Sequence, residues 1–449
     1  MEQTQIPAPQ APRPFNFPRF EKFRLPNGLE VWYARHKKLP LISCQLVIMS
    51  GALHDPSGQE GAATFLADML EEGTQKHDAE EFSMLLEEKG IEFSASADYN
   101  GSYLSMNTLT GHAGAALKLF GEALTAPRLA EKDMERLRKI RQGHRRRAAD
   151  MPDKIAAEVL MRHVYPGHRY SLPAMGRLEH NSSLTLEQLR DYYRKHYRPE
   201  NAILVLVGDL PTAEINDLLD KTLGYWPAGG QRFELPPVLE TPRDFGLQLV
   251  HRPGAQQAEI RLGHAGVDRH DPAYFGALLA NQILGGYFLS RLNMNLREDK
   301  GLTYGIESRF SLRRVTGPFY ISAAVDSDKV ALALREIFEE LERMTREEVS
   351  AEELDNARGY LSGVFPIAFE TGAQIAAGLS NIALFDLKDD YYRNFRAQLE
   401  RVTVQDVLNA ARKYFNPSRA QVVVVADREQ VAESLAEKYS LNISEIDVA

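Results

Sequence analysis

The sequence has few of the features that mark disulfide-rich or membrane-spanning proteins. Its 449 residues include a single cysteine, Cys44, which cannot form an internal disulfide. Because Cys44 lies in the apolar stretch 41–47, we expect it to be a small buried side chain. The longest apolar runs, 202–207 and 422–426, are far shorter than the roughly 20 residues that a membrane-spanning helix needs. The sequence therefore predicts no transmembrane segment.

The sequence also lacks an excess of basic residues. It has 53 lysines and arginines against 62 aspartates and glutamates, which gives a formal net charge of −9. Proteins that bind nucleic acid usually carry a basic surface that neutralises phosphates. We therefore expect no nucleic-acid partner.

The first 20 residues are rich in proline and do not read as a signal peptide. Prolines stand at positions 7, 9, 12, 14 and 18, and no charged start is followed by an apolar core. This composition predicts a flexible arm over residues 1–20. The compartment stays open, because the protein would be cytoplasmic as written and periplasmic if a signal peptide had been removed.

A repeated segment divides the chain into two similar parts. Residues 185–209 match residues 403–427 without a gap, at an offset of 218 positions. Both copies begin with a threonine (Thr185 and Thr403), continue with helical apolar spacing, reach a proline and end in a β-branched apolar strand. Threonine is a common helix N-cap, and proline ends a helix. Each copy therefore predicts the same unit, a helix followed by a buried strand.

The segments before each copy follow one plan, strand pairs and long helices. In the first half the patterns predict strands at 30–33, 41–49, 93–97 and 103–109 and helices at 60–72, 80–89, 115–124 and 131–150. In the second half they predict strands at 246–251, 259–266, 303–312 and 319–325 and helices at 272–284, 330–343 and 351–365. The stretch 226–243, rich in proline and glycine, predicts a linker. We therefore expect an α+β protein with two homologous halves, 21–225 and 244–449.

The segment 61–74 resembles the pitrilysin/insulinase-type zinc metallopeptidases, in their mitochondrial-processing-peptidase-like branch. Its residue pairs at 65–66, 69–70 and 73–74 frame the position where that family carries its inverted zinc motif, H-x-x-E-H. Further agreement comes from the turn at 25–29, the hairpin around Asn100, the segment 165–168 and the duplicated chain. The resemblance covers about residues 20–449 and implies that each half is a mostly antiparallel sheet covered by helices.

The zinc ligands of that motif are absent. In the family, two histidines on one helix face share the metal, and a glutamate between them polarises the bound water. The matching positions here are Thr64, Ala67 and Asp68, of which only the aspartate could bind a metal strongly. The family's third ligand, a glutamate roughly 75 to 80 residues downstream, falls in the arginine-bearing stretch 141–147. We therefore expect a subunit that lacks the zinc motif and holds no cofactor of its own.

The remaining histidines do not form a substitute for the motif. His163 and His168 lie on either side of a Pro-Gly turn, and His264 and His270 are six positions apart. These spacings do not predict a shared zinc. His77 precedes an acidic segment that is better explained as a solvated helix N-terminus.

The second half keeps two residues that the family uses near its active site. The segment 290–304 resembles the family segment in which an arginine and a tyrosine, seven positions apart, project toward the active site, and Arg297 and Tyr304 match them. The spacing predicts Arg297 on the last turn of a helix that Gly301 ends, with Tyr304 on the next strand. The resemblance implies that the pair binds peptide and stabilises charge on the scissile carbonyl oxygen. The alternative is that Arg297 only pairs with an acidic neighbour and Tyr304 is half-buried in a strand.

A basic run covers residues 136–147, which hold seven lysines and arginines and no acid. Such a run usually forms a solvated helix face. The alternative is a positive patch for an acidic partner surface or for peptide carboxylates.

These residues support two hypotheses about function. In the first, the chain is the non-zinc subunit of a heterodimeric zinc metallopeptidase, inactive alone, that supplies Arg297 and Tyr304 in trans to a homologous zinc-bearing subunit. Its substrate would be an unfolded peptide bound in extended form along an edge strand of the zinc subunit. In the second, the chain is a catalytically inactive structural or peptide-binding scaffold, like the core subunits of respiratory complexes that resemble this family. An independent hydrolase has little support, because no Ser/His/Asp or Cys/His constellation is visible.

Overall fold

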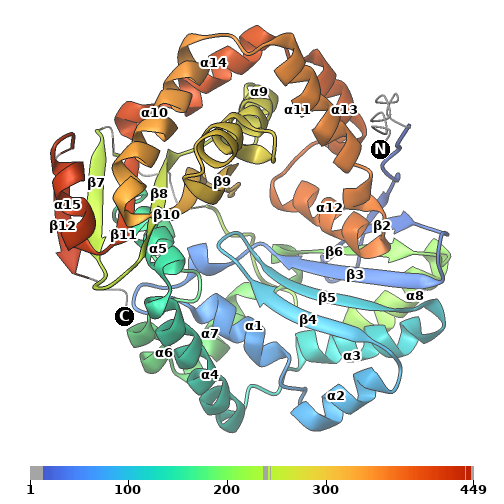
Figure 1. Cartoon of the computed structure of the whole chain (residues 1–449). Helices are drawn as coiled ribbons and strands as arrows, with labels where there is room; N and C mark the ends of the chain where they lie inside the picture. Colours follow the sequence, from blue (N-terminus) through green and yellow to red (C-terminus); the bar gives the residue numbers. More distant parts are fainter. Residues whose placement is uncertain (1–13, 236–240, 243, 440, 446–449) are drawn as a thin grey trace, which may run out of the picture.

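The computed structural model describes residues 14–235, 241–242, 244–439 and 441–445, and these residues form two α+β halves (Figure 1). The strands of the first half are β1 (Glu21–Arg24), β2 (Glu30–Arg35), β3 (Leu41–Ile48), β4 (Glu92–Ala97), β5 (Ser102–Leu109) and β6 (Ala202–Gly208). Those of the second are β7 (Gly246–His251), β8 (Gln257–Ala265), β9 (Thr303–Phe310), β10 (Pro318–Asp326), β11 (Gln421–Ala426) and β12 (Leu441–Glu445).

The two sheets have the same topology over five strands. The first has the order β1-β2-β6-β3-β5-β4, and the second has the order β12-β7-β11-β8-β10-β9. In each sheet one central pair is parallel (β2 with β6, β7 with β11), and the strands from there to the β4 or β9 edge are all antiparallel. The sheets differ at the other edge, where β1 is antiparallel to β2 and β12 is parallel to β7. The prediction of two homologous, mostly antiparallel halves is confirmed.

Helices surround both sheets. The first half of the chain contains α1 (Ala62–Leu70), α2 (Ala79–Glu87), α3 (Ala113–Thr125), α4 (Glu131–Asp150), α5 (Pro152–Val164), α6 (Leu178–Ser183), α7 (Leu186–His196) and α8 (Thr212–Leu223). The second contains α9 (Tyr274–Asn281), α10 (Val330–Arg346), α11 (Ala351–Val364), α12 (Gly372–Leu384), α13 (Tyr391–Arg401), α14 (Val404–Tyr414) and α15 (Arg428–Ala436). Two π-helical segments, η5 (Gln282–Gly286) and η6 (Asn293–Asp299), follow α9. In the described ranges, no helix is long and apolar enough to cross a bilayer.

Short 3₁₀ turns connect several of these elements. They are η1 (Ala52–His54), η2 (Thr110–His112), η3 (Arg169–Ser171), η4 (Pro199–Asn201), η7 (Ser327–Lys329), η8 (Ile367–Phe369) and η9 (Pro417–Arg419).

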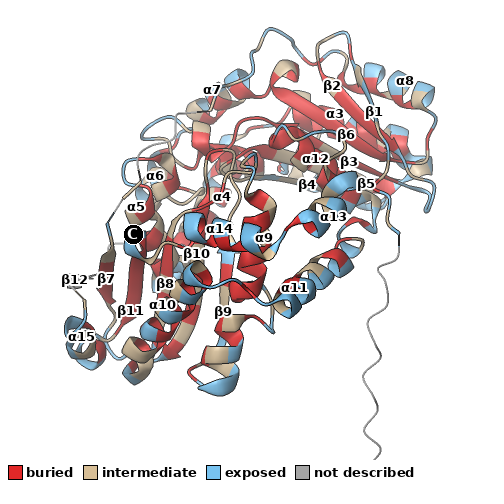
Figure 2. Ribbon diagram, turned by 90° about the horizontal axis from the view of Figure 1, so that it is seen from above, coloured by how far each residue is buried: buried red, intermediate tan, exposed pale blue. Residues whose placement is uncertain are grey.

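The sequence repeat corresponds to α7 with β6 and to α14 with β11. Thr185 accepts a hydrogen bond from the backbone N–H of Gln188, and Thr403 accepts one from that of Asp406. In both cases the third helical residue bonds back to the cap, so each helix starts with a reciprocal capping box. Every residue of β6 and β11 is buried, and Figure 2 shows outer helices such as α11 and α13 exposed on one side only.

Each half of the chain lends one helix to the sheet of the other half (Figure 1). The helix α5 packs on β8 and β11 of the second sheet, where Ile155 and Leu160 join Val423 and Val425 in one apolar cluster. The helix α12 packs on β3 and β6 of the first sheet, with Leu379 in its apolar cluster. The two helices start 220 positions apart, close to the repeat offset, so the exchange is reciprocal.

The end of the predicted proline-rich arm is packed against the second half. Phe17 is 2% exposed, and its ring lies 5.0 Å from that of Phe369 and 5.1 Å from that of Tyr392. Phe15 contacts Phe365 edge-on at 5.5 Å. The prediction of a flexible arm over residues 1–20 is therefore wrong for residues 15–17, because the aromatic side chains in this segment bury apolar area. Residues 1–13 lie outside the described residues.

The first part of the predicted linker is fastened to the first half. Trp226 is 1% exposed and belongs to the first-half core. The backbone N–H groups of Gly229 and Gly230 donate to the carboxylate of Glu200, and the ring of Phe233 lies 4.4 Å from the buried ring of His196. Residues 236–240 and 243 of the linker lie outside the described residues.

Candidate functional site

The helix α1 carries the degenerate zinc-motif positions, and a buried ion pair holds its N-terminus. The Asp55 carboxylate accepts hydrogen bonds from the backbone N–H groups of Gly61 (2.7 Å) and Ala63 (2.9 Å), and it also pairs with Arg169 at 2.9 Å. Gly61 has a φ of +101°, and a Cβ at this position would lie 2.2 Å from the Met175 carbonyl oxygen. The start of α1 therefore requires both the aspartate and the glycine.

An arginine guanidinium lies beside the motif positions. Arg141 on α4 donates to Thr64 Oγ1 at 2.9 Å and to Asp68 Oδ2 at 2.5 Å. The side chain of Arg141 is 2% exposed, and its guanidinium carbon lies 4.6 Å from the centre of the Phe65 ring. Ala67, at the position of the catalytic base, is fully packed. The sequence analysis placed a cation in this region but did not predict that it bonds directly to two of the motif positions.

The same guanidinium connects α1 to α4 and α6. Arg141 Nε donates to Asn181 Oδ1 at 2.8 Å, and Asn181 Nδ2 donates to the carbonyl oxygens of Met175 and Arg177. Burial lowers the pKa of the Arg141 guanidinium, and the neighbouring Asp68 offsets part of that effect. Because each nitrogen of Arg141 has a partner, the network fixes the relative position of three helices.

The residues at the motif positions do not fit a zinc ion. A structural or catalytic zinc needs three or four N, S or carboxylate ligands from the protein. Here the single carboxylate, Asp68, is bonded to a guanidinium, and a cation beside Arg141 would be repelled. Among the residues that the structure describes, no group of three or more histidines, cysteines, aspartates or glutamates is arranged to hold a metal.

The basic run at 136–147 is neither a simple solvated face nor one positive patch. Besides Arg141, the buried Arg145 forms a two-pronged ion pair with Glu158 at 2.6 and 3.0 Å. Arg136 pairs with Glu72, and Arg138 donates to main-chain carbonyl oxygens at the end of α6. The inward side of α4 is therefore an ion-paired packing surface, and both interpretations are wrong for that side. The reason is that the acidic partners lie on other elements, out of reach of local sequence patterns. On the outward side Lys139, Arg146 and Arg147 are exposed, as the interpretation of a solvated face predicts.

The helix after His77 starts as predicted. Asp78 is the N-cap of α2, with its carboxylate accepting from the backbone N–H of Glu81 and the Glu81 carboxylate accepting from that of Asp78. His168 likewise caps a turn, because its Nδ1 accepts from the backbone N–H of Tyr170. These contacts give both histidine segments a local structural role.

The second candidate site lies where η6 leads into β9. Arg297 is in η6, the backbone turns at Gly301 with a φ of +58°, and Tyr304 is the second residue of β9. The backbone N–H of Leu302 returns to the Leu296 carbonyl oxygen at 2.7 Å, which closes the end of the helix. The predicted helix, glycine stop and strand are all present. Tyr304 is 91% exposed and lies on the edge strand of its sheet.

A buried asparagine holds η6 against β9. Asn293 Nδ2 donates to the Ile306 carbonyl oxygen at 2.8 Å and to Ser290 Oγ at 3.1 Å. Just before it, Arg291 forms a two-pronged ion pair with Glu353 on α11, at 2.6 and 3.0 Å. Burial raises the pKa of Glu353, but the bonds from Arg291 outweigh this effect and lower the pKa to about 2.

Two buried carboxylates on α10 hold the other side of η6. Asn295 Nδ2 donates to Glu340 at 2.9 Å, and Lys300 Nζ lies 2.9 Å from Glu336. Burial raises the pKa of Glu336, but bonds from Arg335 and Lys300 outweigh it and hold the pKa below its usual range. The segment that carries Arg297 is therefore fixed on two sides by polar contacts.

Arg297 and Tyr304 themselves make few contacts within the chain. Arg297 Nε lies 3.4 Å from Glu298, and the guanidinium carbon lies 4.7 Å from the centre of the Phe288 ring. The acidic pairing that the structural alternative predicted is thus present. The half-buried tyrosine of that alternative is not, because Tyr304 projects almost entirely into solvent.

Comparisons with known proteins identify the family. Residues 31–177 match the family model described as Insulinase (Peptidase family M16), and residues 183–361 match the model described as Peptidase M16 inactive domain. The chain belongs to peptidase family M16. The pitrilysin/insulinase resemblance is therefore confirmed. The assignment of the family's zinc-motif positions to Thr64, Ala67 and Asp68 stays a prediction from the residues that flank them.

Relatives of this M16 chain extend over almost its whole length. It is 23% identical over 407 residues to "Uncharacterized zinc protease YmxG" of Bacillus subtilis, covering 90% of this chain and 98% of the relative. Its fold matches the peptidase M16 inactive domain from Pseudomonas fluorescens with a TM-score of 0.85 and 26% identity, covering 91% of this chain and 98% of the other. A protease from Helicobacter pylori has the same fold, with a TM-score of 0.84, 21% identity and coverage of 91% and 99%.

Proposed function

We propose that this chain is the non-zinc subunit of a two-chain M16 metallopeptidase. In this proposal Arg297 and Tyr304 enter the active site of a homologous zinc-bearing subunit and bind an extended peptide there. The zinc and the catalytic base belong to the partner, and this chain alone does not cleave peptides.

The observation that carries the proposal is the exposure of Tyr304 on a rigid support. A tyrosine with a structural role buries most of its ring and satisfies its hydroxyl. Tyr304 instead is 91% exposed at a sheet edge, directly after a segment that Asn293, Glu336 and Glu340 hold in place. Ordering a segment whose side chains then face solvent is typical of a binding site.

The two side chains suit the stabilisation of a developing negative charge. A guanidinium offers fixed N–H donors, and a phenol offers one O–H donor, so both can bond to a carbonyl oxygen as it becomes anionic. The ring of Phe288 beside Arg297 shields one face of the guanidinium and leaves its edge free to donate. The partner's zinc would supply the polarised water in such a complex.

Reconstitution tests this role. The chain is mixed with its H-x-x-E-H-bearing homologue, and cleavage of an unfolded peptide is followed. We expect no cleavage by this chain alone and cleavage by the pair, with Arg297→Ala and Tyr304→Phe each lowering kcat/KM by about 100-fold, the usual loss for an oxyanion donor.

Matched controls come from the same half of the chain. Arg309 is an exposed arginine on β9, and Tyr360 is a half-exposed tyrosine on α11. Arg309→Ala and Tyr360→Phe are expected to leave kcat/KM within about two-fold of the wild-type pair, as surface substitutions usually do. An in-trans role is wrong if Arg297→Ala and Tyr304→Phe behave like these controls.

A peptide-binding or structural scaffold is the second candidate, and the network around Arg141 favours it. At the predicted motif positions, that network of hydrogen bonds holds α1, α4 and α6 together. A purified chain that forms a stable homodimer and captures no zinc-bearing homologue would support the scaffold over the peptidase subunit.

A further inference from the structure

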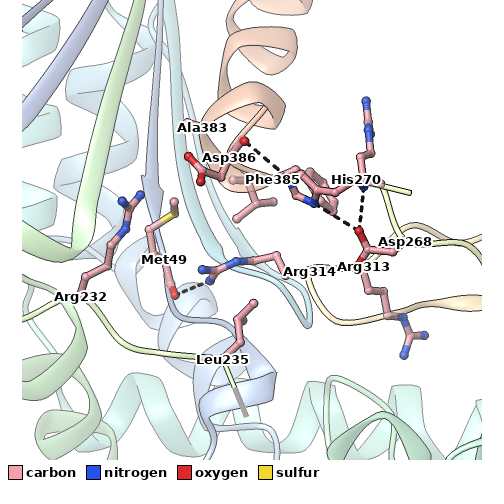
Figure 3. A pocket seen from close by; sticks show the side chains of 12 residues that line it. Met49, Arg232, Leu235, Asp268, His270, Arg313, Arg314, Ala383, Phe385 and Asp386 are labelled. Carbon is pink, nitrogen blue, oxygen red and sulfur yellow. Dashed lines mark hydrogen bonds and ion pairs between the residues drawn. The ribbon is translucent and has the colours of Figure 1, made fainter. Parts of the chain in front are cut away.

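A cavity between the two halves of the chain is lined by an unusual number of arginines. It has a volume of about 290 Å³ and lies where the end of β3, the linker, the β9–β10 loop and the end of α12 meet (Figure 3). Arg232, Arg269, Arg313 and Arg314 all contribute to its lining. In the described parts of the chain, none of these four arginines forms an ion pair with an acidic side chain.

Two of the four arginines are held by aromatic rings. The guanidinium of Arg313 lies 4.1 Å from the Tyr99 ring and 4.3 Å from the Tyr170 ring. That of Arg269 lies between 5.1 and 5.6 Å from the rings of Tyr274, Phe385 and Tyr391. Ring contacts stabilise these cations without acidic partners, so they raise the positive potential around the cavity.

The other two arginines are placed to share a ligand. Arg314 Nη1 donates to the carbonyl oxygens of Met49 (2.9 Å) and Asn100 (3.4 Å), and the backbone N–H of Arg314 donates to Asn100 Oδ1 (2.8 Å). The other two guanidinium nitrogens, Nε and Nη2, make no hydrogen bond to any described residue. Figure 3 shows the Arg314 guanidinium turned toward Met49, on the side of the cavity where Arg232 also lies, whereas Arg313 points away. Arg232 has no hydrogen-bond partner among the described residues.

The charge of Arg314 is poorly compensated. Burial and the nearby Arg232 both lower the pKa of the Arg314 guanidinium, because each of them disfavours its positive charge. Two like charges beside a cavity, neither of them in an ion pair with a described acidic side chain, favour the binding of an anion between them.

The rest of the lining narrows the class of anion. Asp268 lies across the cavity from Arg232 and accepts a hydrogen bond from the backbone N–H of His270, whereas Asp386 lies near Met49, on the side of the cavity where Arg232 lies. These two carboxylates disfavour a doubly charged phosphate. Apolar side chains, among them Leu235 and Phe385, also line the cavity. A ligand for this cavity must pair with two arginines, carry little negative charge and tolerate an apolar lining. A single carboxylate on a short, largely uncharged chain does all three, since arginine pairs with carboxylates through two parallel hydrogen bonds.

We propose that this cavity is a binding site for a peptide carboxylate, held between Arg232 of the linker and Arg314 of the second half. The carboxylate can come from a peptide C-terminus or from an acidic side chain, and both sources share the same chemistry. Because Met49 of the first half holds Arg314, a bound carboxylate connects both halves and the linker. The site needs no zinc and no partner subunit.

Binding of labelled pentapeptides to the full chain tests the proposal. Three N-terminally labelled glycine-serine peptides are compared by fluorescence anisotropy: one with a free C-terminus, one amidated with a central glutamate, and one amidated with no acid. We expect the acid-free peptide to bind at least about ten-fold more weakly than one or both of the others, the loss expected for a charge-assisted arginine pair. Preference for the first peptide identifies a C-terminus, and preference for the second identifies an acidic side chain.

Variants of the two arginines complete the test. Arg232→Gln and Arg314→Gln are each expected to weaken binding of the carboxylate peptides by about ten-fold or more. Arg146→Gln, at an exposed arginine on α4, is the matched control and should bind as the wild type. The proposal is overturned if no peptide binds, if all three bind equally, or if both variants bind like the control. Arg232 is exposed, so Arg232→Gln should leave the fold intact. Its peptide binding therefore tests the proposal even if Arg314→Gln unfolds the chain.

Discussion

The two candidate sites of this chain use arginine in opposite ways. Arg141 in the first half is 2% exposed, and its nitrogens are all bonded within the chain. Arg297 in the second half lies at the surface with one ion pair and one ring contact, seven positions before the exposed Tyr304. The first half uses its arginine for packing, whereas the second half leaves its polar groups open to solvent.

This difference shows how the fold can hold its helices together at the predicted motif positions without a metal. A zinc site holds its helices together through coordinate bonds, and those bonds contribute to folding. In this chain hydrogen bonds from one guanidinium connect α1, α4 and α6 at the same place.

The largest effect on stability is expected from Arg141→Met. The substitution leaves Asp68 and Asn181 without their main partner in a buried setting, and breaking one side of a buried pair costs up to about 3–5 kcal/mol. Because the Asp68 side chain is 38% exposed and partly solvated, we expect a loss of about 2–4 kcal/mol in the free energy of unfolding. Urea denaturation measures the loss.

Arg146→Met on the same helix is the control, and we expect its free energy of unfolding to stay within about 0.5 kcal/mol of the wild type. Equal stability of the two variants would show that Arg141 does not hold the helices together.

A second, smaller effect concerns pH and also belongs to the first half. Burial, followed by the nearby Arg314, lowers the pKa of His54 to about 4, and burial, followed by His54, lowers that of His196 to about 3. Both pKa values lie below the value of about 6.5 expected in the unfolded chain. The stability from these neutral rings is therefore fully present above about pH 6.5 and is lost as the pH falls through the folded-state values. We expect the urea midpoint to fall between pH 7.5 and pH 5.

The variant His196→Gln should weaken this pH dependence, even if it lowers stability at pH 7.5. His144→Gln, at an exposed position on α4, provides the comparison. If the urea midpoint of His196→Gln falls with pH as steeply as that of His144→Gln, the two buried histidines do not cause the pH dependence.

The smallest effect on stability is expected from Tyr304→Ala. Because the ring buries almost no area, its removal should change the free energy of unfolding by less than about 0.5 kcal/mol. Asn293→Ala, which removes a buried bond to the Ile306 carbonyl oxygen, should cost about 1–2 kcal/mol. If Tyr304→Ala destabilises the chain as much as Asn293→Ala, the tyrosine has a structural role.

Most of the fold could be predicted from the sequence, because the repeat and the apolar periodicity are local signals. The helix and strand of each repeat unit start and end where Thr185, Thr403 and the following prolines indicate. The sequence patterns predict no helix at α5 or α12. Their exchange could not be predicted either, because an apolar helix face does not specify which sheet it covers. The packing of Phe15 and Phe17 was missed for a related reason, since prolines dominate the composition around them.

The candidate sites also differ in whether local sequence signals could predict them. The positions of Arg297, Gly301 and Tyr304 follow from spacing within one short segment, and the structure places them on the predicted helix, turn and strand. The partners of Arg141 lie on α1 and α6, so no local pattern could reveal them. One signal was present, because Arg141 follows Thr64 by 77 positions, which falls within the spacing expected for the family's third ligand.

The exchange of helices has a consequence for how the gene can be divided. A chain cut in the linker would yield a first fragment that carries α5, whose apolar face belongs on the second sheet, and a second fragment that carries α12, whose face belongs on the first. Each fragment would expose one sheet face and one helix face to water and would aggregate when produced alone. The two fragments should become soluble only when they are co-expressed, because each one supplies the helix that covers the other's sheet.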